Sequence, residues 1–227
     1  MKICAIFNTK LIENNIIKEL FLNIQTIQIY SKNNELQIVV VISDKDKASN
    51  EHLIDNSIKI IHGNLNYEYG AYKIGYNLYP NYNVYVCLQD NYVLCHQNNE
   101  EINNKPLCVK PNLPPDLHIL NDNTIYSVPE RNGSGFTSMK NSRELCKQLY
   151  KNTVIENSPD KFQLALHNSF ILTNKILQEL IETLNFLPKN KIESMLCERI
   201  FGLYFIEKKI KCLNLQEYGR KISKKRQ

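Results

Sequence analysis

A single aspartate follows a buried strand near the middle of the chain. Residues 82–88 are mostly apolar on both sides, as expected for a buried strand, and the polar run Gln89-Asp90-Asn91 comes directly after them. In open α/β sheets, ligands bind outside the carboxyl ends of the strands. An aspartate at such an end is a natural ligand for a metal ion or a polar substrate group. The alternative is that Asp90 only caps the turn that ends the strand.

A second group of charges lies near the end of the chain, in the dipeptide Glu198-Arg199. The spacing of apolar residues over 191–211 predicts a helix that is apolar on two opposite sides, so both charges are at least partly enclosed. Enclosed charges destabilise a protein unless they are paired or take part in chemistry. A structural ion pair and a functional site both fit this pattern.

A helix over residues 68–79 is predicted just before the first aspartate, and Pro80 ends it. Its aromatic face is formed by Tyr69, Tyr72, Tyr76 and Tyr79. Gly70 and Gly75 each weaken a helix by about 1 kcal/mol relative to alanine, which indicates close approach to a sheet or to a ligand. The tyrosine stripe favours packing between helix and sheet over a platform on which sugars stack.

Strands alternate with helices in the first half of the chain. The predicted strands are residues 3–7, 36–43, 57–62 and 82–88, and the helix that precedes residues 68–79 spans residues 11–24. This alternation is typical of an α/β fold, in which helices cover both faces of a mostly parallel sheet.

The second half is predicted to be less regular. Loops are expected at 97–115, which is rich in Asn and Pro, and at 129–136. Short strands are expected at 117–120 and 124–128, and helices at 142–151 and 174–186. A strand or turn over 162–172 would place His167, Asn168 and Ser169 in the interior or in a site.

The composition is that of a soluble globular domain, with 227 residues, 43% hydrophobic and 22% charged. The net charge is +5, and the C-terminal tail alone carries five positive charges, on Arg220, Lys221, Lys224, Lys225 and Arg226. The body of the protein is therefore close to neutral. A frayed, solvated tail is the preferred interpretation, and binding of nucleic acid is not expected.

Cysteine usage and hydropathy both favour a cytoplasmic protein, or one in the host cytoplasm if the source is a virus. The seven cysteines contain no CxxC pair, which predicts reduced thiols in place of a disulfide framework or a zinc site. Nowhere do 18 apolar residues run together, so no transmembrane helix is expected.

Two short motifs resemble those of GT-A type glycosyltransferases. The run N-x5-G-A-Y-x2-G-Y over 64–76, followed by the apolar strand and Q-D-N, resembles the donor-binding half of that family. The F-I-L at 170–172 and S-M-L-C-E-R-I-F at 194–201 resemble the acceptor side of small polysaccharide- and lipopolysaccharide-type members, including those of large DNA viruses.

The resemblance covers most of the chain and implies one Rossmann-like domain over 1–227, with a mixed, mostly parallel central sheet flanked by helices. A nucleotide-sugar-binding half would span 1–96, an acceptor-binding half 97–215, and a basic flexible tail 216–227.

The resemblance also implies which residues bind the donor and the metal. The implied donor-site residues are Phe7, Asn8, Thr9, Asp44, Asn64, Gly70, Tyr72, Lys73, Gln89, Asp90 and Asn91, with Asp46 as a substitute for Asp44. Asp90 would bind Mn²⁺ or Mg²⁺. The family pattern has two acidic residues here, whereas this chain has one, and Asn91 could supply an oxygen.

The implied reaction moves a sugar from a nucleoside diphosphate to a hydroxyl of a glycan or glycoconjugate. If the enzyme inverts the sugar's configuration, a carboxylate must take the acceptor proton. The resemblance assigns this role to Glu198, with Glu130 and Glu193 as substitutes. Arg199 would pair with Glu198 or face the phosphates.

Two other functions stay open. The first is a catalytically inactive GT-A type protein used for interaction, which a single acid at 89–91 would suit. The second is a tyrosine-rich nucleic-acid binder with a basic tail. The terminal position of the positive charge and the helical period of the tyrosines argue against the second.

Overall fold

The structure is a computed structural model, and it describes residues 1–9, 14–43, 54–90, 92–102, 105–114, 117–128, 146, 169–184 and 186–221. Several predicted features lie outside these residues: the loop at 129–136, all of the helix at 142–151 except Cys146, and Asp44, Asp46, Asn91, Glu130, His167 and Asn168.

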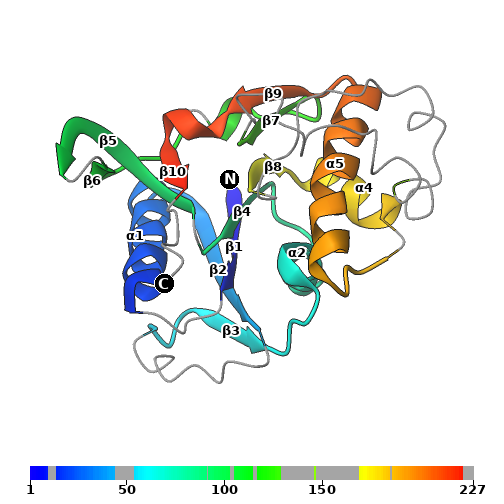
Figure 1. Cartoon of the computed structure of the whole chain (residues 1–227), viewed down its shortest axis with the longest axis horizontal. Coiled ribbons are helices and arrows are strands. Elements are labelled where there is room, and N and C mark those ends of the chain that lie inside the picture. The colour runs from blue at the N-terminus through cyan, green and yellow to red at the C-terminus, as the bar shows by residue number, and fades with distance from the viewer. Residues whose placement is uncertain are drawn as a thin grey trace.

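A seven-stranded sheet forms the centre of the molecule (Figure 1). The strand order is β3-β2-β1-β4-β8-β7-β9, and within this sheet β8 alone runs against the others. The strands are β1 (Lys2–Thr9), β2 (Glu35–Ile42), β3 (Lys59–His62), β4 (Val84–Gln89), β7 (Thr124–Ser127), β8 (Phe170–Thr173) and β9 (Lys211–Asn214). The prediction of a mixed, mostly parallel α/β sheet is confirmed.

Helices cover both faces of this sheet. They are α1 (Asn14–Tyr30), α2 (Tyr67–Leu78), α4 (Asn174–Thr183) and α5 (Lys191–Glu207). Successive residues of a strand point to opposite faces. Thus Ile3, Ala5 and Phe7 of β1 join the core under α1, while Cys4 and Ile6 join the core under α2, α4 and α5. Figure 1 shows α1 on one side of the sheet and α2, α4 and α5 on the other side.

The tyrosines of α2 are part of the core, as their spacing predicts. Tyr69 and Tyr72 are buried, and the ring of Tyr69 lies 5.9 Å from that of Phe201 in α5. Gly75 meets the sheet directly: a Cβ added to it would lie 2.6–2.9 Å from side-chain atoms of Ile6. The predicted close approach of the helix to the sheet is therefore confirmed at Gly75.

The Asn-rich segment after β4 is not the predicted loop. It forms the antiparallel hairpin β5 (Tyr92–Ile102) and β6 (Lys105–Pro111). β10 (Gly219–Lys221), which belongs to the predicted flexible tail, pairs with residues 92–94 of β5. The loop prediction for 97–115 was wrong because main-chain pairing between strands needs no apolar side chains.

Several element boundaries also differ from the sequence prediction, and α4 ends at Thr183 where residue 186 was expected. α1 extends to Tyr30, and residues 117–119 form a 3₁₀ helix, η2 (Leu117–Ile119), where a strand was expected. α5 ends at Glu207, because Lys209 adopts a positive φ of 54° and Ile210 N–H donates to the Phe205 carbonyl at 2.8 Å. This left-handed residue ends the helix and turns the chain into β9.

The cysteine prediction holds only in part. Cys4, Cys87, Cys146, Cys197 and Cys212 are free thiols. Cys95, however, takes part in a disulfide, contrary to the prediction that every thiol is reduced. Among the described residues, no helix is both long enough and apolar enough to cross a membrane.

Replacing Asn190 by alanine should reduce the free energy of unfolding by about 1 kcal/mol. Asn190 Oδ1 accepts from the Glu193 N–H at 3.0 Å, and the Glu193 carboxylate accepts from the Lys189 N–H at 2.7 Å, so the two side chains cap α5 reciprocally. Urea unfolding measures the loss. Lys189→Ala is the control, because its side chain makes no part of the cap. Equal effects of the two variants would contradict this account of the cap.

Candidate functional site

The sheet has a switch point between β1 and β4. The chain moves from β1 outward to β2 and β3, and then returns to place β4 on the other side of β1. At this point the connections leave the carboxyl ends in opposite directions, which opens a crevice where ligands of open α/β sheets bind. Asn8 near the end of β1 and Asp90 after β4 flank it, and Asp90 N–H donates to the Asn8 carbonyl at 3.0 Å.

Asn64 joins this edge to the start of α2. Its Nδ2 donates to Asn8 Oδ1 at 3.0 Å and to the Tyr67 carbonyl at 2.6 Å, while its Oδ1 accepts from Asn66 N–H at 3.1 Å. Its own N–H donates to the Ile42 carbonyl at the end of β2. Through its side chain and its main-chain N–H, the buried Asn64 thus ties the ends of β1 and β2 to the first turn of α2.

The turn over residues 63–67 has an unusual backbone. Gly63 has φ 92° and Tyr67 has φ 55°, a left-handed conformation that is uncommon for an aromatic residue. Gly70 follows one turn later, and a Cβ added there would lie 2.5 Å from both Asn64 Oδ1 and Asn66 Cβ. The close approach predicted at Gly70 is therefore to this turn, and a side chain at position 70 would displace the Asn64 amide.

The hydroxyl of Tyr72 is buried in the core under α2. Tyr72 is 1% exposed, and its hydroxyl has no hydrogen-bond partner among the described residues. Burial raises the pKa of Tyr72 well above its usual value, and the charges of Cys87, Glu68 and Asp90 raise it further. A buried, unpaired hydroxyl costs about 1–3 kcal/mol. The Tyr72 hydroxyl is therefore a buried polar group that no described residue satisfies.

The first half of α5 contacts the start of α2. Ser194 Oγ donates to Glu68 Oε2 at 3.1 Å. Burial raises the pKa of the Cys197 thiol, and the charges of Glu68, Glu198 and Glu193 add to the rise. The predicted proton acceptor Glu198 is half-buried and directly follows Cys197 in α5.

Arg199 is enclosed, as the helix pattern predicts. It is 5% exposed, and its Nη1 donates to the Met195 carbonyl at 3.0 Å. Burial raises the pKa of Cys146 to about 11, and the positive charge of Arg199 opposes that rise. Arg199 therefore lies near Cys146.

The other predicted donor-site residues divide into two groups. Asn8, Asn64, Gly70 and Asp90 gather at the switch point, as the contacts above show, whereas Tyr72 is buried in the core under α2. Gln89, which is buried, stands opposite Asn8 in the pairing of β1 with β4, and Lys73 is a half-buried residue of α2.

Phe7 and Thr9 have no exposed surface. The Phe7 side chain belongs to the core under α1, so it supports the sheet and does not reach the edge where a nucleoside would lie. Asp44 and Asn91 lie outside the described residues.

No protein-family model matches this chain. A search of curated proteins likewise finds no significant relative. The site must therefore be interpreted from its own geometry.

Sequence reasoning did not identify Glu68. It used this residue only to mark the start of α2, and nothing local shows that its carboxylate meets Ser194, 126 positions away. The only local sequence feature of Glu68 is that it lies four positions before Tyr72, which places both residues on one face of the helix.

An open groove lies at the opposite edge of the sheet. Its volume is about 840 Å³, and its lining includes Asn83, His118, Asp122, Asn174 and Lys175. Much of its polar surface is already used internally: Asp122 accepts from Thr173 Oγ1 at 2.9 Å and pairs with Lys175, and Asn174 Nδ2 donates to the Tyr82 carbonyl at 2.9 Å.

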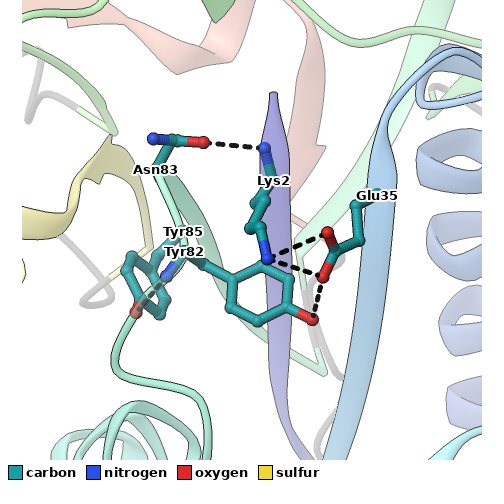
Figure 2. A network of polar contacts seen from close by, with 5 residues as sticks. All are labelled: Lys2, Glu35, Tyr82, Asn83 and Tyr85. Carbon is teal, nitrogen blue, oxygen red and sulfur yellow. Dashed lines mark hydrogen bonds and ion pairs between the residues drawn. The ribbon is translucent and has the colours of Figure 1, made fainter.

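The same edge is closed by a polar network (Figure 2). Lys2 Nζ lies 3.0 Å from Glu35 Oε2, and Tyr82 donates its hydroxyl to Glu35 Oε1 at 3.3 Å. The Lys2 N–H donates to Asn83 Oδ1 at 2.8 Å, and the Tyr85 hydroxyl accepts from Tyr82 N–H at 3.4 Å. These contacts join β1, β2 and β4 at their amino ends, so this edge holds the sheet together and Asp90 lies at the far end.

Proposed function

We propose that this chain is a glycosyltransferase that moves a sugar from a nucleoside-diphosphate sugar to a hydroxyl of a glycan or glycoconjugate. One observation carries the proposal: Asn8, Asn64 and Asp90 form a connected polar cluster at the switch point between β1 and β4. Ligands of open α/β sheets bind at such a point, and the cluster contains the motif residues on which the family resemblance rests.

The proposed reaction exchanges one bond for another. The acceptor oxygen bonds to the anomeric carbon of the sugar, the bond from that carbon to the diphosphate breaks, and the electron pair leaves with the diphosphate. The proton of the acceptor hydroxyl passes to a carboxylate. In this proposal Glu198 is that carboxylate, because it is a half-buried acidic residue of α5, the helix whose Ser194 contacts the start of α2.

The donor would lie across the carboxyl ends of β1 and β4. Asn64 would hold the turn over residues 63–67 in place, because its side-chain amide already makes three hydrogen bonds within the protein. Asp90, half-buried, would face the diphosphate through a divalent cation. When bound, Mn²⁺ or Mg²⁺ would supply the positive charge that the leaving diphosphate requires.

The proposal predicts that a nucleotide sugar stabilises the protein. In a thermal-shift screen of UDP, GDP, dTDP and CMP sugars, each with and without Mn²⁺, at least one should raise Tm by about 5–10 °C at a hundredfold excess over Kd. Asp90→Asn should weaken that binding at least tenfold and abolish donor hydrolysis and transfer.

The matched control is Asp122→Asn, since Asp122 is an exposed aspartate in the groove at the opposite edge. It should bind the donor as the wild type does. If no nucleotide sugar changes Tm, or if both aspartate variants respond alike, the proposed function is wrong.

A further inference from the structure

The start of α2 and the start of α5 lie side by side (Figure 1). Lys191 Nζ of α5 lies 5.9 Å from the centroid of the Tyr67 ring of α2. Ser194, three positions after Lys191, donates its hydroxyl to Glu68 Oε2 at 3.1 Å. Residues three apart share a helix face, so the face of α5 that carries Lys191 and Ser194 is turned toward the first turn of α2.

The proposed proton acceptor lies on this same face of α5. Glu198 follows Lys191 by seven positions, which is close to two full turns, so the two side chains leave the helix on the same side. At a rise of about 1.5 Å per residue their Cα atoms are about 10 Å apart along the axis. A short oligosaccharide can bridge that separation.

Tyr67 is held in an unfavourable backbone conformation. Its φ is 55°, a region that asparagine and glycine adopt far more readily than an aromatic residue. Its carbonyl accepts from Asn64 Nδ2 at 2.6 Å, and the Nδ2 of the preceding Asn66 donates to the Pro188 carbonyl at 3.1 Å. Strained residues persist where the surroundings hold them, and they cluster at ligand sites. A tyrosine here therefore calls for a use of its ring.

The ring and the ammonium group are both available to a ligand. Tyr67 is half-buried and Lys191 is exposed. Among the described residues Lys191 makes no ion pair. The nearest acidic residues of the two helices are already used, because Glu193 belongs to the cap of α5 and Glu68 accepts from Ser194. The positive charge beside the Tyr67 ring is thus not compensated by a carboxylate.

We infer that Tyr67 and Lys191 bind the acceptor, and that the sugar they bind carries an anionic group, either a carboxylate or a phosphate. The C–H face of the sugar would pack against the Tyr67 ring, whose face is electron-rich, and the anionic group would pair with the Lys191 ammonium. The inference rests on the proposed function, which places the reacting hydroxyl at Glu198 and the donor across the ends of β1 and β4. It adds a substrate class to that function, namely an acidic acceptor.

Ligand-observed NMR titrations with methyl glucuronide, glucose 6-phosphate and methyl glucoside test this site without any measurement of activity. At least one anionic sugar should bind the wild type about fivefold more tightly than the neutral glucoside, as expected for one exposed charge pair. The tighter of the two identifies the anionic group. Lys191→Gln should abolish this preference and leave the affinity for methyl glucoside unchanged.

Tyr67→Asn should weaken binding of all three sugars at least about fivefold, because it removes the ring but suits the backbone. Its Tm should stay the same or rise by about 2–4 °C as the strain is relieved. The matched control is Lys209→Asn, since Lys209 also has a positive φ, of 54°, and lies beyond the end of α5. This variant relieves the same strain and loses one positive charge, yet it should bind the sugars as the wild type does.

Four results would overturn the inference. They are no saturable binding of either anionic sugar, unchanged binding in Tyr67→Asn or Lys191→Gln, equal weakening in Lys209→Asn, and a Tm several degrees lower in Tyr67→Asn, which would mean that the ring serves the fold. Displacement of the bound sugar by the nucleotide that stabilises the protein would also overturn it, because Lys191 would then belong to the donor site.

The outcomes separate this inference from the proposed function. If a nucleotide sugar raises Tm but neither anionic sugar binds, the acidic acceptor is wrong and the glycosyltransferase proposal is untouched. If an anionic sugar binds through Tyr67 and Lys191 but no nucleotide sugar changes Tm, the anionic-sugar site stands and the proposed function is wrong.

Discussion

Asn64→Asp is expected to lower the free energy of unfolding by about 3 kcal/mol at neutral pH, since each buried group left without a partner costs about 1–3 kcal/mol. Asn64 is 2% exposed and donates from Nδ2 to Asn8 Oδ1 and to the Tyr67 carbonyl. A carboxylate has nearly the same shape but cannot donate. It would place negative oxygen against two acceptors and keep only the bond from Asn66 N–H.

The loss should depend on pH in a definite direction. Burial and neighbouring acceptors raise the folded-state pKa of the new carboxyl above its unfolded value, which is about 3.9. The destabilisation is therefore greatest at neutral pH and shrinks as the pH falls through the folded-state pKa, because the protonated carboxyl can donate again.

Urea unfolding at pH 7 and pH 5 measures both effects. Asn81→Asp is the matched control, since Asn81 is exposed at the opposite edge of the sheet. It should change stability little at either pH. A loss below about 1 kcal/mol for Asn64→Asp, or the same loss at both pH values, would show that this amide does not hold the carboxyl edge of the sheet together.

Gly75→Ala is expected to destabilise the protein by about 2 kcal/mol, although alanine favours a helix by about 1 kcal/mol over glycine. The added Cβ would lie 2.6 Å from Ile6 Cδ1 and 2.7 Å from Ile6 Cγ1, so either α2 or the Ile6 side chain must move. Asn77→Ala, at an exposed position of the same helix, should be neutral or slightly stabilising.

A double-mutant cycle identifies the cause. Ile6→Ala alone removes core volume and should destabilise the protein by about 2–5 kcal/mol. In combination with Gly75→Ala the clash disappears, so the double variant should be at least about 1 kcal/mol more stable than the sum of the single losses predicts. Additive losses would mean that Gly75 is required for some reason other than its distance from β1.

The sequence predicted β1, β2 and β4 because each is a mostly apolar run that ends at polar residues, whereas β9 was not predicted. The segment before Asp90 shows both the strength and the limit of such reasoning. The apolar run over residues 82–88 predicted β4, and the tyrosine spacing correctly predicted that Tyr69 and Tyr72 belong to the core.

The segment after Asp90 was misjudged because its structure depends on distant partners. The residues of β5 from His96 onward are polar and rich in Asn, and no local pattern marks them as a strand. Their main chain pairs with β6, while β10 joins the start of β5 from the end of the chain. Strand propensity depends strongly on such neighbours, which a single sequence does not reveal.

The candidate site was predictable where it follows a strand end and unpredictable where it depends on packing between helices. Asp90 was identified from its place after β4. Glu68 was not, because its hydrogen bond with Ser194 of α5 exists only in the tertiary fold.

The attachment of β10 to β5 has a consequence for the order of events during synthesis. The Tyr92 hydroxyl donates to the Leu215 carbonyl at 2.7 Å across 123 residues, and Cys95 N–H donates to the Tyr218 carbonyl. A ribosome adds about 5–20 residues per second, so the segment directly after Asp90 waits roughly 6–25 s for the strand that fastens it. A nascent chain can thus build β1 to β4 early and yet expose an unpaired β5 edge until β10 has been synthesised. Chaperone binding to that edge, and misfolding of chains cut before Leu215, are the vulnerabilities that this topology creates.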